Sequence, residues 1–290
     1  MLKDKIENIL IKLGSLDRRV IFIIIALSVT IPLIKPNWVA LPIIAKPETF
    51  KVFEELEQLK EKDKVIVSFE YGPSTMPEIH PMSIALLRHL FSKDILIYGF
   101  ALWPDGNFMS IDAFTEVALE MNKEYDKHYV NLGYKPGGEA VIKGIASDIR
   151  TMYTVDLLGN DIDKLKLMNG IKNISDFDYV ISLSAGDPGS KQWVQFATDP
   201  KSIPFTTGCT SIQVTDIIPY VETNQIRGIL AGMPGAAEYE RLVYDSYKEY
   251  NFTGEATGMM SAQSISHIVI VLFIIFGNIT YFIIRKRGKE

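Results

Sequence analysis

Polar and small residues collect in five short segments, each of which follows a run of β-forming residues. Their side chains offer hydroxyl, carboxylate, ammonium and thiol groups, and their glycines let the backbone come close to a ligand. Free N–H groups at the start of a following helix would favour an anion. The candidate ligand-binding residues are Glu70, Tyr71, Ser74, Thr75, Trp103, Lys135, Gly137, Gly138, Ser184, Asp187, Ser190, Thr207, Cys209 and Thr210. For any single segment a plain strand-to-helix connection is the favoured interpretation, because glycine and proline are common in such turns.

The segment GYKPGGE, residues 133–139, illustrates both interpretations. Its spacing departs from the two phosphate-binding templates, G-x-G-x-x-G and G-x-x-x-x-G-K-[ST], and its lysine comes before the paired glycines. Glu139 would already occupy the positive end of the following helix and would repel a phosphate. The sequence therefore favours a structural turn here over a nucleotide-binding loop.

Signals for catalysis are weak. The segment ISLSAGDPG, residues 181–189, has no glycine two places before Ser182 or Ser184, as a serine nucleophile elbow would need. The four histidines lack metal-ligand spacing, and one cysteine cannot form a thiolate zinc site. Cys209 could be a nucleophile near a helix start, but a lone cysteine is more often a small buried residue. The sequence predicts no catalytic set, no metal and no cofactor.

An α/β domain over residues 46–252 would bring these segments together. Strand-forming runs alternate with helical patterns, which predicts a Rossmann-like, largely parallel sheet with helices on both faces. Right-handed crossovers then place all the strands' carboxyl ends at one edge, where ligands usually bind. The expected strands are 64–72, 94–102, 129–134, 178–186 and 202–208, and 225–232 is either a last strand or the start of a helix. The expected helices are 77–91, 110–128 (capped by Ser110 or Asp112), 137–153, 190–198 and 235–250.

Two apolar runs lie near the ends of the chain. The run 267–284 has no acidic, lysine or arginine residue and covers roughly 27 Å, close to the hydrocarbon thickness of a bilayer. The run 20–34 is followed by Lys35 and Trp38, which suit a lipid–water boundary. The sequence thus predicts transmembrane helices over 20–38 and 266–284. A linker, 253–265, would join the second helix to the domain, while an amphipathic segment, 1–19, and a basic tail, 285–290, would lie on the cytoplasmic side.

The charge distribution predicts the orientation. Five basic residues precede Val20 and four follow Ile284, so the positive-inside rule places both termini in the cytoplasm and the central domain outside it. Between Lys35 and Ser264 the chain has 21 basic and 31 acidic residues, a balance that disfavours nucleic acid as a partner. Because Cys209 is the single cysteine, no intrachain disulfide can hold the domain, and its own core must do so.

The second membrane helix contains Gly277, Asn278 and Thr280. A lone anchor surrounded by membrane lipid gains nothing from an amide, whereas small and amide-bearing residues serve contacts between helices. These three residues are therefore candidate helix–helix contacts. The neighbour could be the first helix of the same chain, a second copy in self-association, or another membrane subunit.

The segments LSAGDPG, GMPGAAEYE and SAQSISHIVIVLFIIFGN together resemble a family of uncharacterised prokaryotic membrane proteins. The resemblance covers most of the chain and implies one outer α/β domain between two terminal transmembrane helices. It implies no activity and carries over no functional residues.

Three functions remain open on the sequence. The favoured one is a non-enzymatic subunit or accessory domain of a larger membrane complex. The second is a membrane-anchored domain that binds or senses a small-molecule ligand at the strand-end turns. The third is a hydrolase or transferase that uses Ser184, Asp187, Cys209 or Glu70.

Overall fold

The computed structural model describes residues 17–35, 42–252 and 254–287. The chain divides into two compact units, Ile43–Ala256 and the pair Met1–Pro42 with Thr257–Glu290. The first unit is an α/β domain. The second unit contains α2 (Arg18–Ile34) and most of α11 (Glu255–Arg287).

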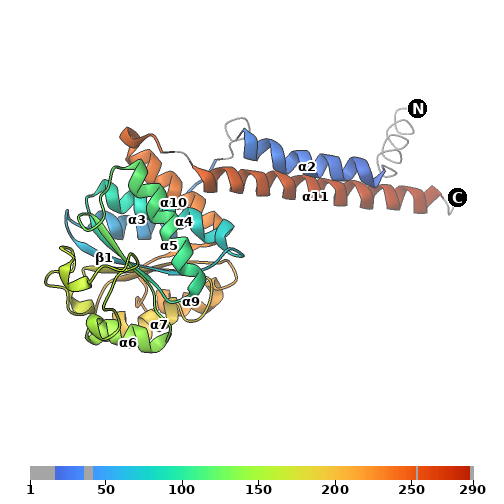
Figure 1. The fold of residues 1–290 in the computed structure, drawn as a ribbon. Coiled ribbons are helices and arrows are strands. Elements are labelled where there is room, and N and C mark those ends of the chain that lie inside the picture. The colour runs from blue at the N-terminus through green and yellow to red at the C-terminus, as the bar shows by residue number, and fades with distance from the viewer. Residues whose placement is uncertain (1–16, 36–41, 253, 288–290) are drawn as a thin grey trace. The chain divides into compact units, whose positions relative to one another are not determined.

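Six parallel strands form a single sheet in the order β3-β2-β1-β4-β5-β6 (Figure 1). The strands are β1 (Lys64–Glu70), β2 (Leu96–Ala101), β3 (Tyr129–Tyr134), β4 (Tyr179–Ser184), β5 (Phe205–Cys209) and β6 (Ile229–Ala231). This order is that of doubly wound sheets, in which the direction of winding reverses between β1 and β4. The prediction of an α/β fold with a largely parallel sheet is confirmed, and all five strand pairings are parallel.

Helices cover both faces of the sheet (Figure 1). One face packs against α3 (Pro47–Glu57), α4 (Met76–Ser92), α5 (Pro104–Glu120) and α10 (Gly232–Ser246). The other is covered by α6 (Glu139–Ser147), α7 (Ser190–Trp193) and α9 (Val214–Glu222). Short elements complete the domain at α8 (Asp199–Lys201), at the π-helix Val194–Thr198 and at the 3₁₀ turns Ile149–Thr151, Ile162–Lys164, Ile174–Asp176 and Lys248–Tyr250.

The central strands are buried on both faces. All six residues of β4 are buried, as are all residues of β1 after Lys64. Strands covered by helices on both sides read as continuous apolar runs and not as alternating patterns. Against that background, the buried polar residues Ser68, Glu70, Ser182 and Ser184 stand out.

Two helices of the domain differ from the sequence prediction. Helix α5 begins at Pro104 and ends at Glu120, so the expected helix 110–128 is shifted toward the N-terminus and neither Ser110 nor Asp112 caps it. Proline suits the first turn of a helix because its missing N–H would have no partner there. Helix α6 ends at Ser147, and Asp148 accepts the Arg150 N–H to cap a separate 3₁₀ turn.

Helix α11 is long and apolar enough to cross a membrane. Its candidate span, Glu255–Arg285, reaches a mean hydropathy of 2.4 over its most apolar 18 residues, of which 6% are buried. Within the described residues it is the one helix that passes this test. Residues 255–265, expected to be a linker, form the first turns of this continuous helix.

Helix α2 is apolar and largely exposed, but at 17 residues it is shorter than a full span. In the same unit the Ser28 hydroxyl donates a hydrogen bond to Ser266 Oγ of α11 at 3.3 Å, and Pro32 is buried. The expected amphipathic segment up to residue 16, Trp38 of the expected first span, and tail residues 288–290 lie outside the described residues.

Candidate functional site

The carboxyl ends of β1 and β4 meet where the strand order reverses. Glu70 ends β1 and pairs in register with Ser184, which ends β4, while Ser68 pairs with Ser182 two residues earlier. In doubly wound sheets this reversal point is where ligands usually bind. The predicted convergence of the strand-end turns at one sheet edge therefore follows from the observed topology.

Glu70 is fully buried among hydrogen-bond donors. The Ser68 hydroxyl and the Trp193 indole N–H (3.2 Å) donate to Oε1, and the Ser182 hydroxyl donates to Oε2 at 2.8 Å. Burial disfavours the charged carboxylate and outweighs these three donors, so that the pKa of Glu70 rises to about 7. The site therefore holds a carboxyl group that can exchange a proton near neutral pH.

A chain of hydroxyl groups extends from Glu70 toward β5. The Ser190 hydroxyl, on the first residue of α7, lies 3.1 Å from Ser182 Oγ and 2.6 Å from Thr207 Oγ1. Thr207 in turn donates to the Ser182 carbonyl oxygen at 2.9 Å. All of these side chains are at most 2% exposed. The predicted residues Glu70, Ser190 and Thr207 thus belong to one closed network that joins three strands and α7.

Trp103 covers the turn that follows β4. Its indole N–H donates to the Pro188 carbonyl oxygen at 2.9 Å, and a Cβ at Gly186 would lie 3.0 Å from its ring. Gly138 reaches the same turn, because a Cβ there would lie 3.4 Å from Pro188 Cγ. The turns after β2, β3 and β4 therefore touch one another at the sheet edge, as the sequence analysis expected of their residues.

The groups that could act as nucleophiles are engaged or buried. The Ser184 hydroxyl donates to the Gly186 carbonyl oxygen at 2.9 Å and is 1% exposed. Cys209 is fully buried, and burial, followed by the charge of Glu78, raises the pKa of its thiol to about 12. Because the thiolate is the reactive form of cysteine, this environment leaves Cys209 unreactive at neutral pH.

The remaining candidates lie apart from the Glu70 network. The Tyr71 hydroxyl is buried against His80 Nδ1 (2.8 Å) and Ser83 Oγ (2.9 Å) of α4. Asp187 is exposed and forms an ion pair with Lys191 at 3.2 Å. Other candidates take structural positions: Ser74 is exposed, Thr75 is the N-cap of α4, Gly137 has a positive φ, and Thr210 is buried after β5. Lys135 has its ammonium 6.0 Å from the centre of the Tyr153 ring.

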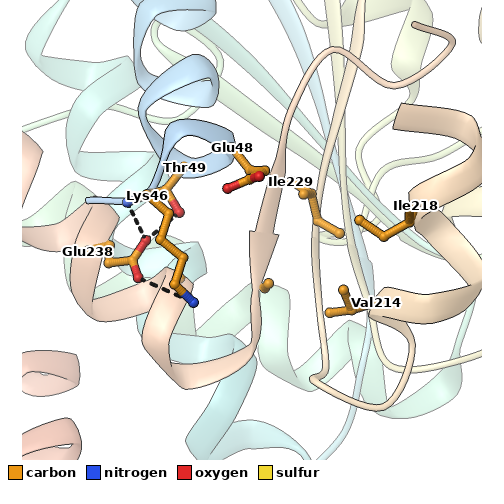
Figure 2. Close-up of a pocket in the computed structure, with 9 residues that line it drawn as sticks. Lys46, Glu48, Thr49, Val214, Ile218, Ile229 and Glu238 are labelled. Carbon is orange, nitrogen blue, oxygen red and sulfur yellow. Dashed lines mark hydrogen bonds and ion pairs between the residues drawn. The ribbon is translucent and has the colours of Figure 1, made fainter. Parts of the chain in front are cut away.

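A cavity of about 250 Å³ lies beside β6 (Figure 2). One wall is apolar and consists of Val214, Ile218 and Ile229. On the other wall Glu238 accepts hydrogen bonds from the Lys46 backbone N–H (3.0 Å) and from the Thr49 hydroxyl (2.7 Å). Glu238, the Lys46 N–H and the Thr49 hydroxyl therefore satisfy one another. None of the predicted site residues is among the nine that line this cavity.

Sequence reasoning missed three partners of Glu70. Ser68 and Ser182 had a usable signal, since each lies two residues before a predicted site residue, on the same face of a strand. Trp193 lies 123 residues beyond Glu70 in the chain, and no spacing rule connects the two. Comparison with protein-family models, with curated proteins and with solved structures gives no match for this chain.

Proposed function

We propose that this chain is a two-pass membrane protein whose α/β domain lies outside the cytoplasm as a non-enzymatic subunit of a larger membrane assembly. The observation that carries the proposal is the open face of α11. Asn278 is exposed there, and a Cβ at Gly277 would meet nothing within 4 Å. These two residues are available to a helix from outside the chain.

The amide of Asn278 is incompletely paired in the described part of the chain. Its Nδ2 donates to the Ile274 carbonyl oxygen of its own helix at 2.9 Å, and its Oδ1 accepts no hydrogen bond from another described residue. An unpaired amide oxygen in hydrocarbon is unfavourable, and a hydrogen bond between membrane helices contributes about 1 kcal/mol. Gly277 beside it would let a neighbouring backbone come close enough to form that bond.

Thr280, the third candidate on this helix, is buried, unlike Gly277 and Asn278. Thr280 is 4% exposed, and its hydroxyl donates to the Phe276 carbonyl oxygen at 2.9 Å. Thr280 therefore serves packing within the chain, whereas Gly277 and Asn278 serve contacts with a second copy or another subunit.

Helix α2 supplies the proposed first crossing. Apart from Arg18 and Arg19 at its start and Thr30, its exposed side chains are apolar. They include Phe22 and Ile34 at 66% and 67% exposure. Two crossings return the chain to the side on which it began, and basic residues flank both ends. The positive-inside rule then favours cytoplasmic termini and an outer α/β domain.

The buried environments of Ser184 and Cys209 support a non-enzymatic role for the domain. The Glu70 network joins β1, β4, β5 and α7 through bonds within the protein. Such a network stabilises the sheet edge on which a partner domain could rest.

The experiment compares the particle mass of the full chain with that of two variants in mild detergent, by light scattering coupled to size exclusion. We expect the wild-type chain to run as an assembly with stoichiometric partners or a second copy. Asn278→Leu removes the amide and should weaken association about fivefold per lost contact. Ile275→Leu, a change at an exposed apolar position of the same helix, is the matched control and should assemble normally. A strictly monomeric wild-type particle would contradict the proposal.

A further inference from the structure

A second cavity, of about 240 Å³, lies at the carboxyl end of β3. Ligand-binding clefts typically measure about 300–1,000 Å³, so a cavity of this size suits a small metabolite better than a nucleotide. The edge of the sheet on which it lies is the one where ligands of open α/β domains bind. Its lining residues that matter here are Asn107, Tyr134, Lys135, Tyr153, Thr154 and Asp156.

Tyr153 is the unusual group of this cavity. The residue is 2% exposed, and its hydroxyl has no hydrogen-bond partner among the described residues. Its ring packs edge-on against the Phe100 ring, with 5.5 Å between the two ring centroids, and this contact fixes its position. Buried hydroxyl groups are nearly always hydrogen-bonded, so an unpaired one calls for a partner from outside the chain. Burial raises the pKa of Tyr153, followed by the charge of Glu70, and the hydroxyl therefore remains a donor at neutral pH.

Lys135 brings to the same place a positive charge that has no direct ion-pair partner among the described residues. Its ammonium lies over the Tyr153 ring, and no ion pair joins it to a carboxylate of the described chain. A lysine without such a carboxylate is notable in a region where acidic residues outnumber basic ones by 31 to 21.

The other polar groups of the cavity are partly engaged in hydrogen bonds of their own. Asn107 Oδ1 accepts the Tyr134 N–H at 2.9 Å, which leaves its NH₂ group as a donor. Asp156 is the one carboxylate among the lining residues. It already accepts hydrogen bonds from the Leu158 and Asn160 backbone N–H groups, the Asn160 side chain and the Tyr125 hydroxyl. The groups left over are mainly donors.

A neighbouring cavity shows the contrast. It shares Tyr153, Thr154 and Val155 with the cavity at the end of β3, and Arg150 and Asp163 also line it. There the Arg150 Nε donates to Asp163 at 2.6 Å, so the two charges compensate each other. Tyr153 borders both cavities, whereas the basic side chain without an ion pair lies in the one that contains Lys135.

We propose that the cavity at the end of β3 binds a small oxyanion-bearing metabolite, a carboxylate or a phosphate, through the Lys135 ammonium and the Tyr153 hydroxyl. Asn107 would contribute a further hydrogen bond through its NH₂ group. The inference does not depend on the membrane assembly proposed above, because every contact it uses lies within the α/β domain.

Calorimetric titration of the full chain in detergent tests the proposal. The probes are acetate, succinate and inorganic phosphate, and succinamide is the neutral counterpart of succinate. Lys135→Met removes the charge and keeps the side-chain length, whereas Tyr153→Phe removes only the hydroxyl. Lys201→Met changes an exposed lysine that does not line the cavity and is the matched control.

We expect at least one anion to bind with a dissociation constant of millimolar or below, and succinamide not to bind. Lys135→Met should weaken binding about tenfold or more, since a charge-assisted contact is lost. Tyr153→Phe should weaken binding several-fold while leaving the melting temperature equal or higher, because it also removes an unpaired buried group. If the Tyr153 hydroxyl had only a structural role, Tyr153→Phe would not weaken anion binding while the melting temperature stayed equal or rose. Absence of binding by all three anions at about 20 mM, or equal binding by Lys135→Met, would overturn the inference.

Discussion

The Glu70 carboxyl group lies in the interior of the sheet, and its protonation must affect the stability of the domain. Its pKa in the folded protein is about 7, against 4.5 as the ordinary value. The folded state therefore binds this proton more tightly than the unfolded state does. The stabilisation is fully present below pH 4.5 and is lost as the pH rises to 7, by about 3 kcal/mol in total.

Glu70→Gln should abolish that pH dependence, because glutamine keeps the shape of the side chain but carries no charge. We expect the melting temperature of wild type to fall relative to the variant as the pH rises from 4.5 to 7. Tryptophan fluorescence at pH 5 and pH 8 can follow unfolding in the detergent-solubilised chain. If the difference in melting temperature between wild type and Glu70→Gln is the same at both pH values, Glu70 does not titrate in this range.

Cys209 should be inert in the folded protein. Its pKa of about 12 and its full burial leave little thiolate and no access for a reagent. We expect an aromatic disulfide reagent at pH 8 to label the chain only after denaturation. Rapid labelling of the native chain would contradict the buried position of this thiol, and the denatured chain serves as the control for total reactivity.

Among the elements, helix α5 packs against β1 through the glycine in its first turn. Gly106 approaches β1 so closely that a Cβ there would overlap with the Phe69 carbonyl oxygen. A backbone atom cannot move aside as a flexible side chain can. Gly106→Ala should therefore destabilise the domain by about 1–3 kcal/mol.

The matched control for this change is Leu119→Ala near the other end of α5, where the side chain is 79% exposed. It should alter stability by less than about 0.5 kcal/mol. Denaturant unfolding of both variants measures the difference. Equal midpoints for the two variants would show that α5 and β1 are not in close contact at Gly106.

Local signals were enough to place most elements. The strand 129–134 was predicted with its observed bounds, and β6 proved to be the short strand Ile229–Ala231, which settles the ambiguity over 225–232. Helix α5 was misplaced because Pro-Asp-Gly-Asn is typical of a turn, although proline also suits a first helical turn. Helices α3 and α9 were not singled out at all.

At the scale of the whole molecule, alternating elements predicted the parallel sheet, but not its order. The order depends on which helices cover which face, and only the packed structure contains that information. The same limit applies to the candidate site. The turn residues are recognisable because turns are rich in glycine, proline and small polar residues. Trp193 reaches the Glu70 network from a helix, and Tyr153 reaches the cavity at the end of β3 from an irregular segment. The composition of neither segment indicates a site.

The account requires that the α/β domain and the chain ends lie on opposite sides of a membrane. Two lysines allow a direct test. Lys201 is exposed on the domain, and Lys289 lies near the end of the sequence. Each is replaced by cysteine in a separate variant. The wild-type chain is the control, because its buried Cys209 should give no background.

Labelling of intact spheroplasts with a membrane-impermeant maleimide is the deciding measurement. The account predicts that Lys201→Cys is labelled in intact spheroplasts and that Lys289→Cys is labelled only after the membrane is permeabilised. Labelling of Lys289→Cys in intact spheroplasts, with Lys201→Cys protected until permeabilisation, would contradict it.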